Sequence, residues 1–374
     1  MRPASAAERE RLGELFAELC AIESPSGEEA ACRERVAGEL RACALACEQD
    51  AAGNLLARVP SAFGGPDPAQ PGVLLCAHLD TVPLTGPVEP VCEDGYCSNR
   101  PEAILGADNK AAVAVFLLAA RRWASEPPPA PVELLFTVGE EVALQGASAF
   151  DVSRLRSRFG YVYDHATPIG DVVLAAPHYH RIVADFHGTS AHAGIRPEAG
   201  RSAIVAAARA IAAMPLGRLD AETTANVGTI HGGTGANVVP GSCRVEAEAR
   251  SLDEARAEAV VTDLLDHLQD GANAAECDLD VTTERVFRGY RTRPTAPHVR
   301  AAEAALRACG YAPRHITTGG GSDANAFEAA GFPCLNLANG TERNHQPDEC
   351  VSVAALESML DVTFALLDEA AEVE

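Results

Sequence analysis

A short apolar run at residues 73–77, followed at once by His78-Leu-Asp80 and then by Pro83, most limits how this chain can fold. Its Val and Leu content predicts a buried strand, which we expect to pair with a strand at residues 54–59. The proline excludes a regular continuation. Alternate strand residues share a face, so a carboxylate at Asp80 could hold one nitrogen of His78 and leave the other for a metal. A polar strand end with a hydrogen-bonded histidine is an equally ordinary interpretation.

Acidic residues occupy the same position after two further predicted strands. Glu140 and Glu141 follow a strand at residues 132–138, and Asp164 follows one at residues 159–163. Strands and helices alternate up to this point, which predicts a doubly wound, largely parallel α/β sheet. Ligands gather at the carboxyl ends of the strands in such sheets, so we expect these acids to lie close together.

Two helix starts are predicted from N-terminal capping residues. Ser26 and Glu29 form a capping-box pattern that opens a helix ending near Leu45. Asp108 precedes an Ala-rich apolar helix at residues 109–120, so its carboxylate is expected at the N-cap. Two interpretations of Asp108 remain open: it only caps the helix, or it caps the helix and also bridges cations.

The composition excludes several classes of partner. A formal net charge of −23 and a pI near 4.8 disfavour nucleic acid and anionic membranes. No apolar run approaches the length of a membrane span, and no signal peptide is evident. The 12 cysteines contain no Cys-x-x-Cys pair, and several lie in predicted helices or strands as small buried hydrophobes: Cys20, Cys32, Cys43, Cys76 and Cys309. We therefore expect a cytoplasmic protein without a disulfide framework.

The pattern changes from about residue 177. Strands and helices then follow in the order β-α-β-β-α-β, at residues 178–186, 202–214, 223–231, 243–250, 252–275 and 278–286. This order is typical of a ferredoxin-like module. We predict that residues 177–290 form an inserted α+β domain and that residues 1–176 and 291–374 form the first domain.

Five candidate ligands lie at or just beyond the end of a strand, at a helix start or in a polar loop: His78, Asp108, Glu141, Asp164 and His345. Nitrogen and oxygen ligands without a thiolate suit two Zn²⁺ ions, or Co²⁺ or Mn²⁺, better than a structural zinc. Two ions about 3.5–4 Å apart need a bridging carboxylate, for which Asp108 is the candidate. Glu140 could act as general base on a bridging hydroxide, and Asp80 could orient His78.

These motifs resemble the di-zinc peptidase, aminoacylase and carboxypeptidase family, over nearly the whole chain. The resemblance is strongest to tripeptidase T-like members, in Gly-Thr-Ser-Ala-His192-Ala-Gly, Glu222-Thr-Thr-Ala-Asn226, Glu248-Ala-Arg250-Ser and Gly-Gly-Gly-Ser-Asp323-Ala-Asn325. It implies that one ion binds His78, Asp108 and Asp164. It implies that the other binds Asp108, Glu141 and His345.

The resemblance also implies that the inserted domain is a lid whose residues His192, Asn237 and Arg250 reach the substrate. Arg250 could pair with a substrate carboxylate, and His192 could stabilise an oxyanion. A histidine in a turn and an arginine at a strand end are otherwise usual surface residues. Many relatives have proline where this chain has Ala193, so the sequence does not determine how rigid that loop is.

A run of glycines at residues 319–321 suggests a different contact with a ligand. No Gly-Lys-Ser/Thr sequence follows it, which excludes a nucleotide-binding loop. Gly320 and Gly321 are instead expected to let the backbone approach the substrate.

The sequence therefore predicts metal-dependent hydrolysis of amide bonds in small peptides, with removal of the N-terminal residue of a tripeptide. An N-acyl or N-succinyl amino acid amidohydrolase on the same scaffold is the alternative. A metal-binding partner module that has lost catalysis is a second one, disfavoured by the intact Glu140. Lid folds of this kind often pair through a strand edge, so we expect a homodimer through the lid domain.

Overall fold

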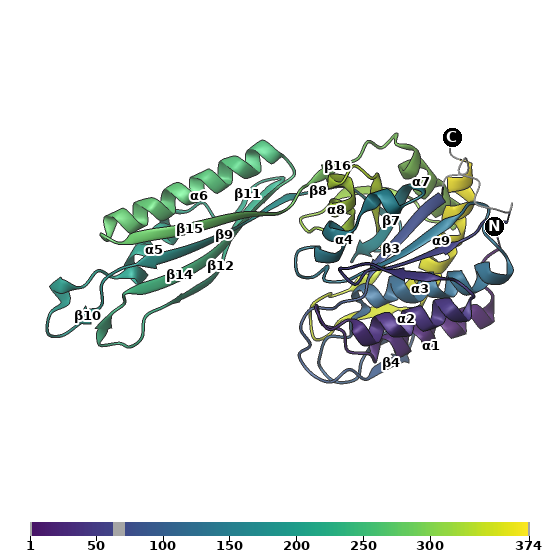
Figure 1. The fold of residues 1–374 in the computed structure, drawn as a ribbon, viewed down its shortest axis with the longest axis horizontal. Helices are drawn as coiled ribbons and strands as arrows, with labels where there is room; N and C mark the ends of the chain where they lie inside the picture. Colours follow the sequence, from purple (N-terminus) through teal and green to yellow (C-terminus); the bar gives the residue numbers. More distant parts are fainter. Residues whose placement is uncertain (1, 63–71, 373–374) are drawn as a thin grey trace. The chain divides into compact units, whose positions relative to one another are not determined.

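The computed structural model describes residues 2–62 and 72–372, which divide into two compact units (Figure 1). Unit 1 comprises Met1–Ala175 and Thr292–Glu374, and unit 2 comprises Ala176–Arg291. Each unit has its own hydrophobic core. No helix in the described part of the chain is long and apolar enough to cross a membrane.

Unit 1 is built on a mixed sheet with the strand order β1-β2-β6-β3-β7-β18-β8, in which β17 also pairs with β8. The strands are β1 (Cys47–Gln49), β2 (Leu55–Val59), β3 (Gly72–His78), β6 (Val132–Thr137), β7 (Ser157–His165), β8 (Asp171–Ala176), β17 (Arg314–Thr317) and β18 (Cys334–Ala338). The central strands β6, β3, β7 and β18 run parallel, so their carboxyl ends meet at one edge. The predicted parallel α/β sheet is confirmed.

One predicted strand pairing is wrong. Strand β2 does not pair with β3, because β6 lies between them and is antiparallel to β2. All six residues of β6 are buried, as expected of an interior strand of a sheet whose two faces are both covered.

Different helices cover the two faces of β3. Val73, Leu75 and Ala77 join the large core formed with the buried helix α3 (Ala107–Ser125), which also contacts α1 and α9. Leu74 instead lies beside Gly160 and Phe332, on the face covered by α8. The other helices of the unit are α1 (Ala6–Cys20), α2 (Ala30–Ala42), α4 (Gln145–Ala149), α7 (Pro297–Ala308), α8 (Asp323–Ala329), α9 (Val353–Ala371) and the 3₁₀ turn η1 (Val152–Arg154).

A small antiparallel sheet with the order β19-β20-β5-β4 completes unit 1. Its strands are β4 (Pro90–Glu93), β5 (Tyr96–Asn99), β19 (Thr341–Glu342) and β20 (Cys350–Ser352). Cys92 and Cys97 face each other across the β4–β5 hairpin and form a disulfide. The expectation was of no disulfide framework, and this single pair was not predicted; the other ten cysteines, all in the described residues, are free.

Unit 2 is a five-stranded antiparallel sheet in the order β11-β12-β14-β9-β15, with α5 and α6 packed on it. Its elements are β9 (His178–His187), β10 (Ala191–His192), η2 (Pro197–Ala199), α5 (Ala203–Ala213), β11 (Gly217–Asp220), β12 (Thr223–Gly232), β13 (Val238–Val239), β14 (Ser242–Ser251), α6 (Glu254–Ala274), β15 (Asp278–Phe287) and β16 (Tyr290–Arg291). Without the edge strand β11, the order β12-β14-β9-β15 is that of a ferredoxin-like sheet. Alternate residues Ile182, Ala184 and Phe186 of β9 face the helices and enter the core.

Candidate metal centre

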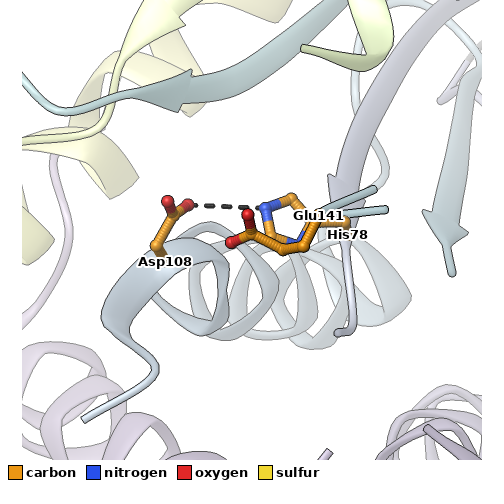
Figure 2. A group of neighbouring side chains, drawn as sticks. All are labelled: His78, Asp108 and Glu141. Carbon is orange, nitrogen blue, oxygen red and sulfur yellow. Dashed lines mark ion pairs between the residues drawn. The ribbon is translucent and has the colours of Figure 1, made fainter. Parts of the chain in front are cut away.

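Asp108 lies at the centre of a cluster in unit 1, and its two carboxylate oxygens face two different histidines. Its Oδ1 lies 3.4 Å from His78 Nε2, and the dashed line in Figure 2 marks this ion pair. Its Oδ2 lies 3.4 Å from His345 Nε2 and accepts a hydrogen bond of 2.8 Å from the Asn344 side chain. One carboxylate therefore joins two groups of potential ligands.

Each histidine also approaches a second carboxylate. His78 Nε2 is 3.6 Å from Asp164 Oδ1, and His345 Nε2 is 2.9 Å from Glu141 Oε1. The five predicted ligands thus form two overlapping groups that share Asp108. Ligand atoms of His78, Asp108 and Glu141 lie within 4.8 Å of one another, as do those of His78, Glu140 and Asp164. Glu140 therefore lies at the centre itself.

The parallel sheet explains this convergence. His78 ends β3, Asp164 is the penultimate residue of β7, and Glu140 and Glu141 follow the end of β6. These three strands are parallel neighbours, so the three segments leave the same edge. His345 comes from the loop between β19 and β20, where its φ of 66° places the backbone in the left-handed region.

The expected N-cap role of Asp108 is wrong. The helix α3 has Gly106 as its N-cap residue, with a φ of 78° and no side-chain capping bond. Asp108 and Asn109 have non-helical backbone angles within the first turn. The Asp108 carboxylate is consequently directed at the two histidines and not at the helix backbone.

The unsatisfied atoms of the cluster fit bound cations. His78 Nε2 and Asp108 Oδ1 are buried, and neither has a hydrogen-bond partner in the described residues. A buried polar atom without a partner costs free energy, which coordination of a cation would recover. His78 Nδ1 lies 2.9 Å from the backbone oxygen of Asp80, and an N–H donated there leaves Nε2 with its lone pair for a metal.

The electrostatics of the cluster also favour positive charge. Burial, reinforced by neighbouring carboxylates, raises the pKa of Glu140 and of Asp164 well above the usual range. Burial disfavours a charged His78, but Asp108 and Asp164 outweigh this effect and raise its pKa well above the usual value. Hydrogen bonds to Asp108 and Glu141 raise the pKa of His345 to about 10. Bound cations would therefore balance the carboxylates of this site.

The carboxylate of Asp80 faces His78 and also binds the turn after β6 that carries Glu140 and Glu141. It lies 3.5 Å from His78 Nδ1, beyond the 2.9 Å contact made by its own backbone oxygen. Its two oxygens accept the backbone N–H groups of Glu140 and Glu141 at 3.0 and 3.1 Å, and Ser26 donates to it at 2.7 Å. Asp80 is fully buried, so these bonds are shielded from water.

The predicted capping box at Ser26 and Glu29 is also wrong. Helix α2 begins at Ala30 with Glu29 as N-cap and makes no side-chain capping bond. The Glu29 carboxylate instead accepts the N–H of Gly27 at 2.8 Å and of Gly139 at 3.2 Å. Both residues support the turn that carries Glu140, a role their local pattern does not reveal.

Three further residues near the centre were given no role by the sequence analysis. Asn344 contacts Asp108 directly, and Glu349 accepts backbone N–H groups from the segment that leads to Asp108. Asp323, buried at the start of α8, accepts from Thr137 at 2.5 Å. Asp323 was noted only as part of the motif Gly-Gly-Gly-Ser-Asp323-Ala-Asn325, and no local pattern distinguished Asn344 or Glu349.

The predicted substrate residues of unit 2 lie on its strands and loops. His192, exposed on β10, accepts the N–H of Gly194 at 3.2 Å, and Asn237 is exposed before β13. Ala193 donates its N–H to the backbone oxygen of Asn237 at 2.9 Å, a bond that proline could not make. Arg250 contacts Glu248 and lies 4.2 Å from the ring centre of Tyr179.

Gly320 and Gly321 lie in unit 1, in the loop between β17 and α8. The N–H of Gly320 bonds to Thr318 Oγ1. The substrate roles of these glycines and of the unit 2 residues stay predictions.

The sequence matches the model of Peptidase family M20/M25/M40 over residues 74–369, most of the chain. The chain belongs to this peptidase family. It is therefore an M20-family metallopeptidase, and the cluster around Asp108 is its candidate dinuclear metal site.

The chain is similar to individual proteins over most of its length. The M20-family chain is 36% identical over 301 residues to the uncharacterized protein YqjE of Bacillus subtilis, covering 80% of this chain and 81% of YqjE. Its fold is similar to aminopeptidase PepT from Bacillus cereus, with a TM-score of 0.86 and 34% identity over 97% of this chain and 99% of that one. A tripeptidase from Staphylococcus aureus has a TM-score of 0.90 and 31% identity, over 97% and 98% of the two chains.

Proposed function

We propose that this chain is an aminotripeptidase that removes the N-terminal residue of small peptides at a dinuclear centre. The observation that carries the proposal is the position of Asp108, whose two oxygens face two histidines with a further carboxylate beside each. One ion would bind His78, Asp108 and Asp164, and the other Asp108, Glu141 and His345. The likeness to aminopeptidase PepT and to a tripeptidase supports the choice of substrate.

The chemistry divides between the ions and the side chains. Two divalent cations, Zn²⁺ in our proposal with Co²⁺ or Mn²⁺ as substitutes, would polarise the scissile carbonyl and lower the pKa of a shared water. Glu140 accepts the proton of the attacking water and then gives it to the leaving amine, so that the peptide C–N bond breaks. The bond from the Glu140 N–H to Asp80 holds this base in place.

We assign substrate recognition to residues of unit 1 and of unit 2. Gly320 and Gly321 offer backbone to the peptide, Arg250 pairs with its carboxylate, and His192 and Asn237 contact the reacting carbonyl. The 2.9 Å hydrogen bond from Ala193 N–H to the backbone oxygen of Asn237 supports a shared role for His192 and Asn237, because it joins the two segments that carry them. We further propose that the protein is cytoplasmic and forms a homodimer through unit 2.

A panel of substrates tests the function. Purified protein is incubated with dipeptides, tripeptides, N-acetyl amino acids and N-succinyl amino acids, with added Zn²⁺ or Co²⁺ and with a chelator control. Chelator-sensitive loss of tripeptides with release of the N-terminal residue is the expected result. Cleavage of the acylated compounds alone would refute the peptidase assignment in favour of an amidohydrolase with the same centre.

A further inference from the structure

We propose that Glu349 is a positioning residue of the dinuclear centre, which fixes the backbone that carries Asp108 and so sets the direction of that carboxylate. The inference rests on the proposed function. Glu349 is 1% exposed and touches neither histidine of the centre in any hydrogen bond or ion pair found among the described residues. Its effect therefore passes through the polypeptide that it binds.

Three backbone donors converge on the Glu349 carboxylate. One oxygen, Oε2, accepts the N–H of Leu105 at 3.0 Å and the N–H of Gly106 at 2.7 Å. The other, Oε1, accepts the N–H of Asp108 itself at 2.9 Å. A buried carboxylate with three short N–H bonds holds a segment more firmly than a single neutral bond does.

Regular helix geometry does not fix the backbone of the segment from Leu105 to Asp108. Gly106 has no side chain with which to cap α3 and takes a left-handed φ of 78°. Asp108 and Asn109 are not helical, so the regular helix does not impose their conformation. The first N–H groups of a helix lack partners within it. Glu349, from another part of the chain, accepts the N–H of Asp108 in this first turn and the N–H groups of Leu105 and Gly106 before it.

Glu349 also joins the two groups of ligands. It lies four residues after His345 in the same loop, and β20 begins directly after it. Cys350 of β20 pairs with Ser98 of β5, and β5 is linked to β4 by the Cys92–Cys97 disulfide. The hydrogen bonds of Glu349 therefore anchor the C-terminal end of the loop that carries His345 to the segment that carries Asp108. Loss of the Glu349 bonds should release both the bridging carboxylate and the second histidine.

The substitution Glu349→Gln tests this role. The three backbone N–H groups bind two carboxylate oxygens in the wild type, but an amide has only one acceptor oxygen. The NH₂ group of Gln would therefore face at least one of these N–H groups. Co²⁺ binding is measured by competition with a chromogenic chelator and by visible absorption, together with kcat, KM and thermal unfolding. We expect Co²⁺ affinity to fall 10- to 100-fold, as for other residues that support metal ligands. The Co²⁺ spectrum should change, and kcat should fall while KM changes little.

Glu133→Gln is the matched control. Glu133 is 3% exposed, and its carboxylate accepts the N–H groups of Arg156 and Ser157 at 2.8 and 2.9 Å. It lies near the start of β6, whereas Glu140 follows the end of that strand. We expect this variant to lose stability but to keep the wild-type Co²⁺ affinity and spectrum. An equal loss of Co²⁺ affinity in both variants would overturn the inference, because it would reflect general destabilisation.

The outcomes separate this inference from the proposed function. If wild-type protein binds two ions and cleaves tripeptides while Glu349→Gln keeps its Co²⁺ affinity, spectrum and kcat, the positioning role is wrong and the function stands. If wild-type protein binds no ions or cleaves no peptide, the function itself fails. Should Glu349→Gln not fold, Glu349→Asp is measured in its place. Glu349→Asp keeps the carboxylate but places both oxygens one methylene farther from the backbone N–H groups. An unchanged Co²⁺ spectrum in this variant would also refute the positioning role of Glu349.

Discussion

Replacement of Asp80 by asparagine should disable the enzyme without removing any metal ligand. The Oδ1 atom of Asp80 accepts from Glu140 N, and Oδ2 accepts from Glu141 N and from the Ser26 hydroxyl. Asparagine has one acceptor oxygen, so at least one of these N–H groups would face an NH₂ group in a site with 0% exposure. A lost bond to a charged acceptor and an unsatisfied donor together cost about 3 kcal/mol of unfolding free energy. Because the turn carries the proposed general base, kcat should fall by on the order of 10²-fold.

Urea unfolding, metal content and tripeptide turnover of Asp80→Asn check this prediction. Ser26→Ala is the control. It removes one hydrogen-bond donor to Asp80 but keeps the carboxylate and its hydrogen bonds to the backbone N–H groups of Glu140 and Glu141. It should cost about 1 kcal/mol and reduce kcat less than tenfold. If Asp80→Asn lost stability but kept kcat within about threefold of wild type, Asp80 would not be what holds Glu140 in place.

Three further predictions follow from the site and the core. Glu140→Gln should retain bound metal while kcat falls about 10²- to 10⁴-fold, and a smaller loss in steady-state assays would exclude Glu140 as the base. Chelation should lower the melting temperature and added Zn²⁺ should restore it, since ions held at about 1,000 times Kd contribute about 4 kcal/mol; an unchanged melting curve would contradict the centre. Burial lowers the pKa of His298 from 6.5 to about 4, so its neutral form stabilises the fold above pH 6.5. That stability is lost as the pH falls toward 4, about 2 kcal/mol of it by pH 5, and His298→Phe should abolish this part of the pH dependence of urea unfolding.

The ligands at strand ends could be predicted because they depend on local pattern and on a general property of parallel sheets. A buried apolar run followed by His78, or by Asp164, identifies both the strand and its carboxyl end. Parallel neighbours then bring these ends together without any knowledge of individual contacts. The ferredoxin-like order of unit 2 could be predicted for the same reason, because it follows from the sequence of elements.

The supporting contacts could not be predicted because residues distant in the sequence compete for the same side chains. Ser26 and Glu29 match a capping box, yet Asp80 and Gly139 are the partners they bind in the fold. Glu349 bonds to a segment more than 240 residues earlier, and no local pattern marks such a contact. The Cys92–Cys97 disulfide likewise depends on the pairing of β4 with β5, which the sequence analysis did not predict.

Lys110, two residues after Asp108, is the only lysine in the sequence. It is 1% exposed, and its ammonium group donates to the backbone oxygen of Ile22 at 2.6 Å. Reagents that acylate amines therefore have a single lysine target, and the native fold shields it. The rate at which Lys110 becomes acylated would report how often the start of α3 opens, without an introduced probe and without a lysine signal from unit 2.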